Sequence, residues 1–189
     1  MKTIIQTDKE FKEAIGAFVI AFSELEFGLA HLGTMTEFDL RKKEKYLITH
    51  MGYSFEQKVK SLTAFIEEHL SEIKPIWDII KNEIGQINSE RRFIVHGLVQ
   101  YFLPKESITA YIKQGKAINK KELSISTIKE LTNRIYHLNT GENGINGEFH
   151  TLFSKTRINK WNELVNNENK IIYRINNNIV SDWKGKAST

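Results

Sequence analysis

The sequence has no cysteine among its 189 residues. Disulfide bonds, thiolate metal sites and a cysteine nucleophile are therefore excluded, while the redox compartment is left undecided. The G-x-S-x-G turn of serine hydrolases and the glycine-rich P-loop are missing as well. Carboxylates do not cluster as a two-metal site requires. His31 and His50 lack metal-ligand spacing and are expected at the surface or the core margin. We therefore expect no metal ion and no cofactor.

Long hydrophobic runs are also missing. The longest, Ala14–Phe22, is interrupted only by Gly16 and falls well short of the roughly 20 residues that span a bilayer. The segment Met1–Gln6 is too short and too polar for a signal peptide. We therefore expect a cytoplasmic protein with no membrane partner.

The composition that is present is ordinary for a globular protein, with 40% hydrophobic and 26% charged residues. The length suits one domain with a substantial core, and no linker or internal repeat divides the chain, so a single domain over 1–189 is expected. The net charge of +4 is compatible with a polyanionic partner, but only mildly. The densest basic run, Arg41–Lys45, is interpreted as a solvated helix face in preference to an RNA-phosphate contact.

The first half of the chain has the spacing of amphipathic helices. Apolar residues recur at intervals of four and three from a cap at Asp8 to Gly33. Their stripe consists of Phe11, Ile15, Phe18, Phe22, Leu25, Leu29 and Leu32. A short helix is predicted over 37–48, and Ser54 then begins a helix with Gln57 completing a capping box. Pro75 suits the first turn of a third helix, which runs to His96.

After this third helix the pattern changes to that of short strands. Strands are predicted over 98–103, 108–112 and 123–125, with turn signals at Pro104, Gly115 and Asn119. A β-hairpin or three-stranded insertion over 98–125 therefore follows the helix.

Helical spacing resumes near the C-terminus. Thr127 and Glu130 have the spacing of a capping box. A loop over 139–147 precedes a last helix over 159–179, and residues 184–189 are expected to fray. The predicted fold class is mainly α, an up-and-down bundle of four to five helices that carries the β insertion.

Polar residues interrupt the apolar pattern in one stretch, Asn88–Gly97. At about 100° per residue, Arg91 lies at the centre of an apolar stripe. The stripe consists of Ile80, Ile84, Ile87, Ile94, Val95 and Leu98. A buried, unpaired guanidinium is costly, so Arg91 needs a carboxylate partner, a wet cavity or another subunit. Glu26, at the margin of the first helix's stripe, is the candidate carboxylate; alternatively, its side chain reaches solvent.

The two most reactive side chains of this stretch do not share a helix face. His96 lies about 140° from Arg91 around the helix axis, and Arg92 is rotated about 100° off the stripe. Joint chemistry of Arg91 and His96 therefore needs more than one straight helix. Either Gly97 unwinds the last turn, or a second copy of the helix completes the site.

Arg91 and His96, with four residues between them, resemble the R-x4–6-H motif of the HEPN superfamily (higher eukaryotes and prokaryotes nucleotide-binding). Arg92 occupies the polar position after the arginine, where that family more often has asparagine. The apolar pair before the histidine, Gly97 after it and the Leu25–Glu26 pair of the first helix are similar to bacterial members. The motif also stands at the end of a helix that follows two others, as in that family.

This resemblance implies a metal-independent endoribonuclease, often a toxin, phage-defence or RNA-decay protein. It implies a homodimer whose two motif helices pack together, so that two arginines and two histidines share one RNA-binding cleft. A cognate antitoxin or regulatory protein is a further candidate partner. Some of these toxins carry a tyrosine two residues after the histidine, which a nucleotidyltransferase modifies. Leu98 stands there, so this mode of silencing is not expected.

The residue types suit RNA cleavage without a metal. Histidine titrates near neutral pH and can remove the 2′-hydroxyl proton. The guanidinium fork matches phosphate oxygens and stays charged, so Arg91 can stabilise the charge that develops on the phosphate. Asn88 and Ser89, one turn earlier, could position the substrate or form only local hydrogen bonds.

Three other interpretations stay open. In a non-catalytic HEPN-like module that binds nucleotides or proteins, Arg91 matters and His96 is dispensable. In the structural reading, Arg91 pairs with Glu26 to hold the bundle and His96 caps its helix C-terminus. An unrelated helical protein would leave Arg91 exposed and unpaired.

Overall fold

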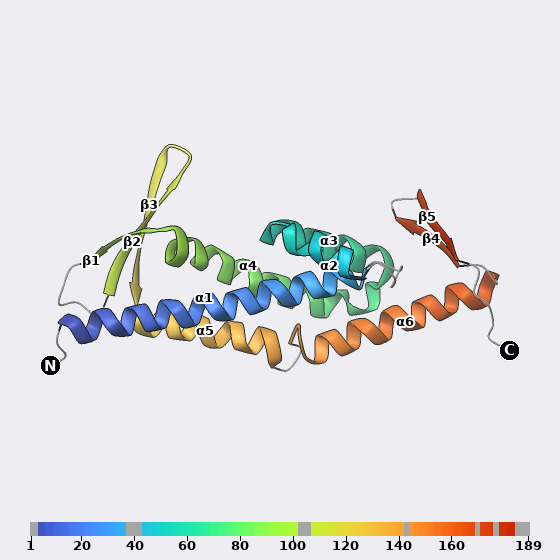
Figure 1. Ribbon diagram of the computed structural model, residues 1–189, viewed down its shortest axis with the longest axis horizontal. Helices are drawn as coiled ribbons and strands as arrows, with labels where there is room; N and C mark the ends of the chain where they lie inside the picture. Colours follow the sequence, from blue (N-terminus) through green and yellow to red (C-terminus); the bar gives the residue numbers. More distant parts are fainter. Residues whose placement is uncertain are drawn as a thin grey trace. The chain divides into compact units, whose positions relative to one another are not determined.

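In a computed structural model the described residues are 4–36, 43–101, 107–141, 144–168, 171–175 and 178–183. They form six α-helices, one short 3₁₀-helix and five strands (Figure 1), so the predicted mainly α fold is confirmed and the predicted number of helices is too low. The chain divides into two compact units. Unit 1 comprises Met1–Gly28 and Asp78–Glu148, and unit 2 comprises Leu29–Trp77 and Phe149–Thr189. The single domain over 1–189 stays a prediction.

The core of unit 1 is built by three helices and one sheet. Helices α1 (Ile4–Thr34), α4 (Lys74–His96) and α5 (Ile125–Thr140) each bury one stripe, because their apolar residues recur every three or four positions. The α1 and α4 residues buried in this unit include Phe11, Phe18, Phe22, Leu25, Ile80, Ile84, Ile87 and Ile94. The predicted stripes are confirmed with three exceptions: Ile15 is half-buried, Val95 is exposed, and Leu98 belongs to a strand that follows α4. Helix α1 starts before the predicted cap at Asp8.

The β insertion is a three-stranded antiparallel sheet of order β1-β2-β3. Its strands are β1 (Leu98–Tyr101), β2 (Ser107–Gln114) and β3 (Ala117–Ser124). The predicted third strand, 123–125, coincides only with the end of β3, because β3 begins right after the turn at Gly115, whose φ of 62° favours glycine. The turn signal at Asn119 is wrong, since this residue lies within β3. The first four residues of β3 are all exposed, including the apolar Ile118, so pairing with β2 defines the strand, not hydrophobic alternation.

Helix α5 has a different cap from the predicted one. Ser124, the last residue of β3, is the N-cap, and its Oγ accepts a hydrogen bond from the Thr127 backbone N–H at 3.0 Å. The predicted Thr127–Glu130 capping box is therefore wrong. Since an N-cap serine satisfies an otherwise unpaired helix donor, one residue ends the strand and starts the helix.

Unit 2 contains the end of α1, α2 (Lys43–Gly52), α3 (Phe55–His69) and nearly all of α6 (Glu148–Glu168). A short 3₁₀-helix, Ser71–Ile73, follows α3. The capping box of Ser54 and Gln57 is confirmed by both of its hydrogen bonds. Trp77 is fully buried in this unit. Its indole N–H donates to Thr63 Oγ1 at 2.9 Å, and its ring stacks on Phe149 at 5.7 Å.

The predicted last helix over 159–179 is confirmed only for residues 159–168. Helix α6 begins at Glu148 and ends at Glu168, and β4 (Ile171–Ile175) pairs antiparallel with β5 (Asn178–Trp183) where a helix over 159–179 was expected. The β-branched residues of this segment favour strands, and its apolar spacing was ambiguous. The predicted loop over 139–147 is shorter, because α5 continues to Thr140. Residues 37–42 of the predicted short helix, much of the run Arg41–Lys45, and 184–189 lie outside the described residues.

Helix α1 is long and apolar enough, over Thr7–Thr34 with a mean hydropathy of 1.5, to span a membrane by length and composition. Its fully buried residues Phe18, Leu25 and Leu29 follow helical spacing, and they belong to the cores of both units. Supplying two cores accounts for the buried stripe of this helix, whereas Val19, Ile20 and Phe27 are exposed.

Candidate active site

Arg91 lies on the buried side of α4 and contacts an aromatic ring. Its guanidinium carbon is 4.6 Å from the centroid of the Phe22 ring, which is 2% exposed and belongs to α1. A guanidinium over an aromatic face gains cation–π attraction without a carboxylate. The apolar stripe therefore tolerates a half-buried arginine. The pairing of Arg91 with Glu26, which is also half-buried, stays a prediction.

His96 is the exposed last residue of α4. The next residue keeps helical hydrogen bonding, since the Gly97 N–H donates to Phe93 O at 3.2 Å. The expectation that Gly97 unwinds the last turn is therefore wrong, and the helix stays regular through His96. A Cβ at position 97 would lie 2.3 Å from Phe93 O and 3.1 Å from Ala110 Cβ, so only glycine fits between the helix and the sheet.

The remaining predicted site residues surround this helix end. Arg92 is exposed and Asn88 is half-buried. Ser89 Oγ donates to Gly85 O at 3.0 Å, which agrees with the local hydrogen bond that was one of its two interpretations. Arg91 and His96 thus occupy one helix end but different sides of it, as their spacing predicted. A single copy of α4 therefore does not place the two side chains on one face.

Two polar contacts that sequence reasoning missed attach other elements to α4. Lys121 of β3 forms an ion pair with Glu90, and its Nζ is 5.9 Å from the Phe93 ring centroid. Arg134 of α5 donates from Nε to Glu83 at 2.6 Å, and this hydrogen bond is the main cause that raises the pKa of Arg134. Each pair is far apart in the chain, so no local pattern announced it. Both pairs fix the orientation of the helix that carries Arg91 and His96.

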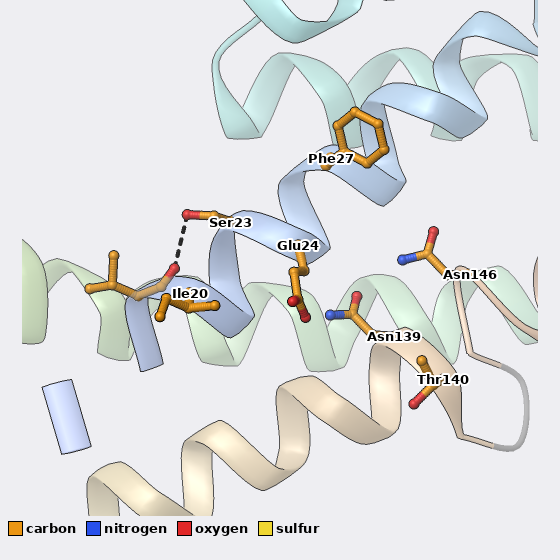
Figure 2. Close-up of a pocket in the computed structure, with 8 residues that line it drawn as sticks. Ile20, Ser23, Glu24, Phe27, Asn139, Thr140 and Asn146 are labelled. Atoms are coloured by element: carbon orange, nitrogen blue, oxygen red, sulfur yellow. Dashed lines mark hydrogen bonds between the residues drawn. The ribbon is translucent and has the colours of Figure 1, made fainter. Parts of the chain in front are cut away.

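A second feature of unit 1 is an open cavity of about 570 Å³ between α1 and the end of α5 (Figure 2). Its lining residues are Val19, Ile20, Ser23, Glu24, Phe27, Asn139, Thr140 and Asn146. Three of them, Val19, Ile20 and Phe27, are exposed apolar side chains of α1. Ser23 Oγ donates to Val19 O at 2.9 Å, so the serine is used within its own helix.

The cavity is distinct from the predicted site, because neither Arg91 nor His96 is among its lining residues. Asn139 is buried at its base and donates to Ala21 O at 3.4 Å. The apolar surface suits an apolar group, with the Glu24 carboxylate as an acceptor at the rim (Figure 2). The sequence feature that could have indicated this cavity is the set of apolar residues of the first helix that fall outside its core stripe.

The histidines that sequence analysis set aside lie in unit 2. His50 is buried, with 3% exposure, so its expected surface or margin position is wrong. Burial and the nearby charge of Lys58 lower the pKa of His50. His31 stacks on His150 at 5.4 Å. Among the described residues, no group of three or more histidine, aspartate or glutamate side chains could hold a metal ion.

No protein-family model, curated protein or solved structure matches the chain. The argument for a function therefore rests on the residues of the molecule itself.

Proposed function

We propose that the protein is a metal-independent endoribonuclease of the HEPN type, with Arg91 and His96 as its catalytic residues. The observation that carries the proposal is the end of α4. An arginine is held half-buried over Phe22, an exposed histidine closes the helix, and Gly97 packs tightly under the sheet. The motif spacing and a mainly α chain support the same family. Bundle topology, toxin or phage-defence role and cytoplasmic location belong to this proposal.

In the proposed reaction the neutral His96 imidazole removes the proton of a ribose 2′-hydroxyl. The 2′ oxygen attacks the adjacent phosphorus, and the bond to the 5′ oxygen breaks, which leaves a 2′,3′-cyclic phosphate. The 5′ oxygen takes up a proton from a second histidine or from water. Arg91 stabilises the added negative charge through its guanidinium N–H groups, and Asn88 and Arg92 position the RNA.

The geometry of one helix supports a homodimer as part of this proposal. Arg91 and His96 face different sides of α4, so a cleft that uses both residue types is completed by a second α4. Val95, 40% exposed beside His96, offers an apolar contact at this helix end. In such a dimer Arg91 of one subunit acts beside His96 of the other. A regulatory protein or antitoxin could bind over the same cleft.

One observation favours a second candidate, a non-catalytic HEPN-like binding module. Arg91 already has a structural partner in Phe22, and a packing role by itself would account for its position. In that case His96 contributes nothing, and the exposed end of α4 binds a nucleotide or a protein.

The test is cleavage of a labelled mixed-sequence RNA in excess EDTA. The wild type, His96→Ala, Arg91→Ala and Arg91→Lys are compared, with His137→Ala as the matched control because His137 is an exposed histidine in the last turn of α5. We expect the wild type and the His137 variant to leave 2′,3′-cyclic phosphate ends, and the His96 variant to lose at least 100-fold, roughly the contribution of a general base. Cleavage that EDTA abolishes, or that survives in His96→Ala, would refute the proposal.

A further inference from the structure

The hairpin of β2 and β3 carries most of the chain's excess positive charge. Its residues 107–124 include four lysines and one glutamate, a net charge of +3, against +4 for the whole chain. Lys113, Lys116 and Lys120 are exposed. The run Arg41–Lys45 has the same net charge of +3, but its first two residues lie outside the described residues. The hairpin is therefore a basic segment of the described chain that hydrophobic patterns did not reveal.

The strand register divides the hairpin into two different faces. Tyr111 pairs with Lys120 and Lys113 pairs with Ile118, and paired residues point to the same side of a sheet. We call these four residues the outer face. The next pair on the same side is Thr109 with Glu122, whose carboxylate accepts a hydrogen bond from Ser107 Oγ. The other side holds the buried residues Ile108, Ala110 and Leu123, together with Lys121.

The buried side of the hairpin is attached to the end of the motif helix. Lys121 is held by Glu90 and lies near the Phe93 ring, and Ala110 packs where Gly97 leaves room. These contacts occupy Lys121 and leave the lysines of the outer face directed away from the helix. The hairpin therefore presents its outer face on the side of the sheet opposite to the one that contacts α4.

We propose that the outer face binds single-stranded RNA. Lys113 and Lys120 neutralise phosphates, and the Tyr111 ring provides a surface on which a base stacks. Lys113 on β2 and Lys120 on β3 belong to neighbouring cross-strand pairs, so they are diagonal neighbours, and each lies next to Tyr111 on the same face. The proposal rests on the proposed function for the identity of the nucleic acid, and it adds an RNA-binding surface outside the site of Arg91 and His96.

The chemistry of the hairpin favours RNA over an anionic membrane. Membrane anchoring needs a cluster of apolar side chains, whereas Ile118 is the single large, strongly exposed apolar residue of the described hairpin. An aromatic ring flanked by lysines, in contrast, is the combination that single-stranded nucleic acids use.

The test is RNA binding by the full chain in the His96→Ala background, so that cleavage cannot interfere. Anisotropy of a labelled single-stranded RNA is measured over a range of salt concentrations. Lys113→Ala with Lys120→Ala should reduce the salt slope by about 1.4 and weaken binding about 25-fold at about 0.1 M salt, because two phosphate contacts are lost. Tyr111→Ala should weaken binding roughly tenfold with an unchanged slope, and Tyr111→Phe should restore it.

The matched control removes two exposed lysines elsewhere, Lys60→Ala with Lys129→Ala, for the same change in net charge. Equal weakening by this control would overturn the proposal, since net charge alone would then explain binding. Absence of RNA binding by the folded His96 variant, or hairpin-dependent binding to phosphatidylserine vesicles alone, would overturn it too. Hairpin-dependent RNA binding without wild-type cleavage would refute only the ribonuclease. Cleavage that is independent of the hairpin would refute only the RNA-binding face.

Discussion

Replacing Arg91 with alanine should destabilise the folded protein even when no RNA is present. The guanidinium lies 4.6 Å from the centroid of Phe22, a ring that is 2% exposed. A cation–π contact is worth about 0.5–1 kcal/mol in water and about 2 kcal/mol when desolvated, so a half-buried pair should contribute about 1 kcal/mol. The loss of packing by the arginine stem adds to this value.

The assay is a double-mutant cycle by urea unfolding. The free energy of unfolding is measured for the wild type, Arg91→Ala, Phe22→Leu and the double variant. The coupling energy isolates the contact from the separate cost of each truncation. We expect about 1 kcal/mol of coupling with equal m-values. The Phe22→Leu variant should cleave RNA more slowly than the wild type but faster than Arg91→Ala, because the ring only positions the guanidinium.

A coupling energy within about 0.3 kcal/mol of zero would refute this reasoning, because that is the usual error of additivity between independent sites. Arg91 would then not be held by Phe22, and a carboxylate such as Glu26 would become its structural partner. A Phe22→Leu variant that cleaves at the wild-type rate, despite a measurable coupling, would show that the position of the guanidinium is set by RNA instead.

Two further predictions concern stability. The pKa of His50 lies below its ordinary value of 6.5, so as the pH falls the unfolded chain takes up a proton on this residue before the folded protein does. The free energy of unfolding should therefore decrease as the pH falls below 6.5, by up to about 1.4 kcal/mol per pH unit. Urea unfolding above and below that pH should show a smaller loss in His50→Gln; equal losses would contradict the prediction. Gly85→Ala should raise the free energy of unfolding by about 1 kcal/mol, since nothing lies within 4 Å of the new methyl group. Gly33→Ala should lower it by about 1–3 kcal/mol, because its Cβ would meet His50 Nδ1 at 2.5 Å. Thermal unfolding of both variants with the same sign would contradict this pair.

Local interactions made part of the molecule predictable from its sequence. The α1 stripe from Phe11 to Leu32 follows helical spacing, and the Ser54–Gln57 capping box involves residues three positions apart. The separation of Arg91 and His96 around one helix is likewise a matter of residue count, and it holds because α4 stays regular to His96. Such features depend on neighbours within a turn or two, which the sequence displays directly.

Contacts between distant residues were decided only by the tertiary structure. Phe22 as the partner of Arg91 and Glu90 as the partner of Lys121 join residues far apart in the chain, so no spacing rule distinguishes them from other candidates such as Glu26. The length of β3 was hidden for a related reason, since its exposed polar residues acquire strand geometry by pairing with β2. Helical spacing can be recognised in the sequence itself, whereas which distant residues contact each other depends on the free energy of the whole packed core.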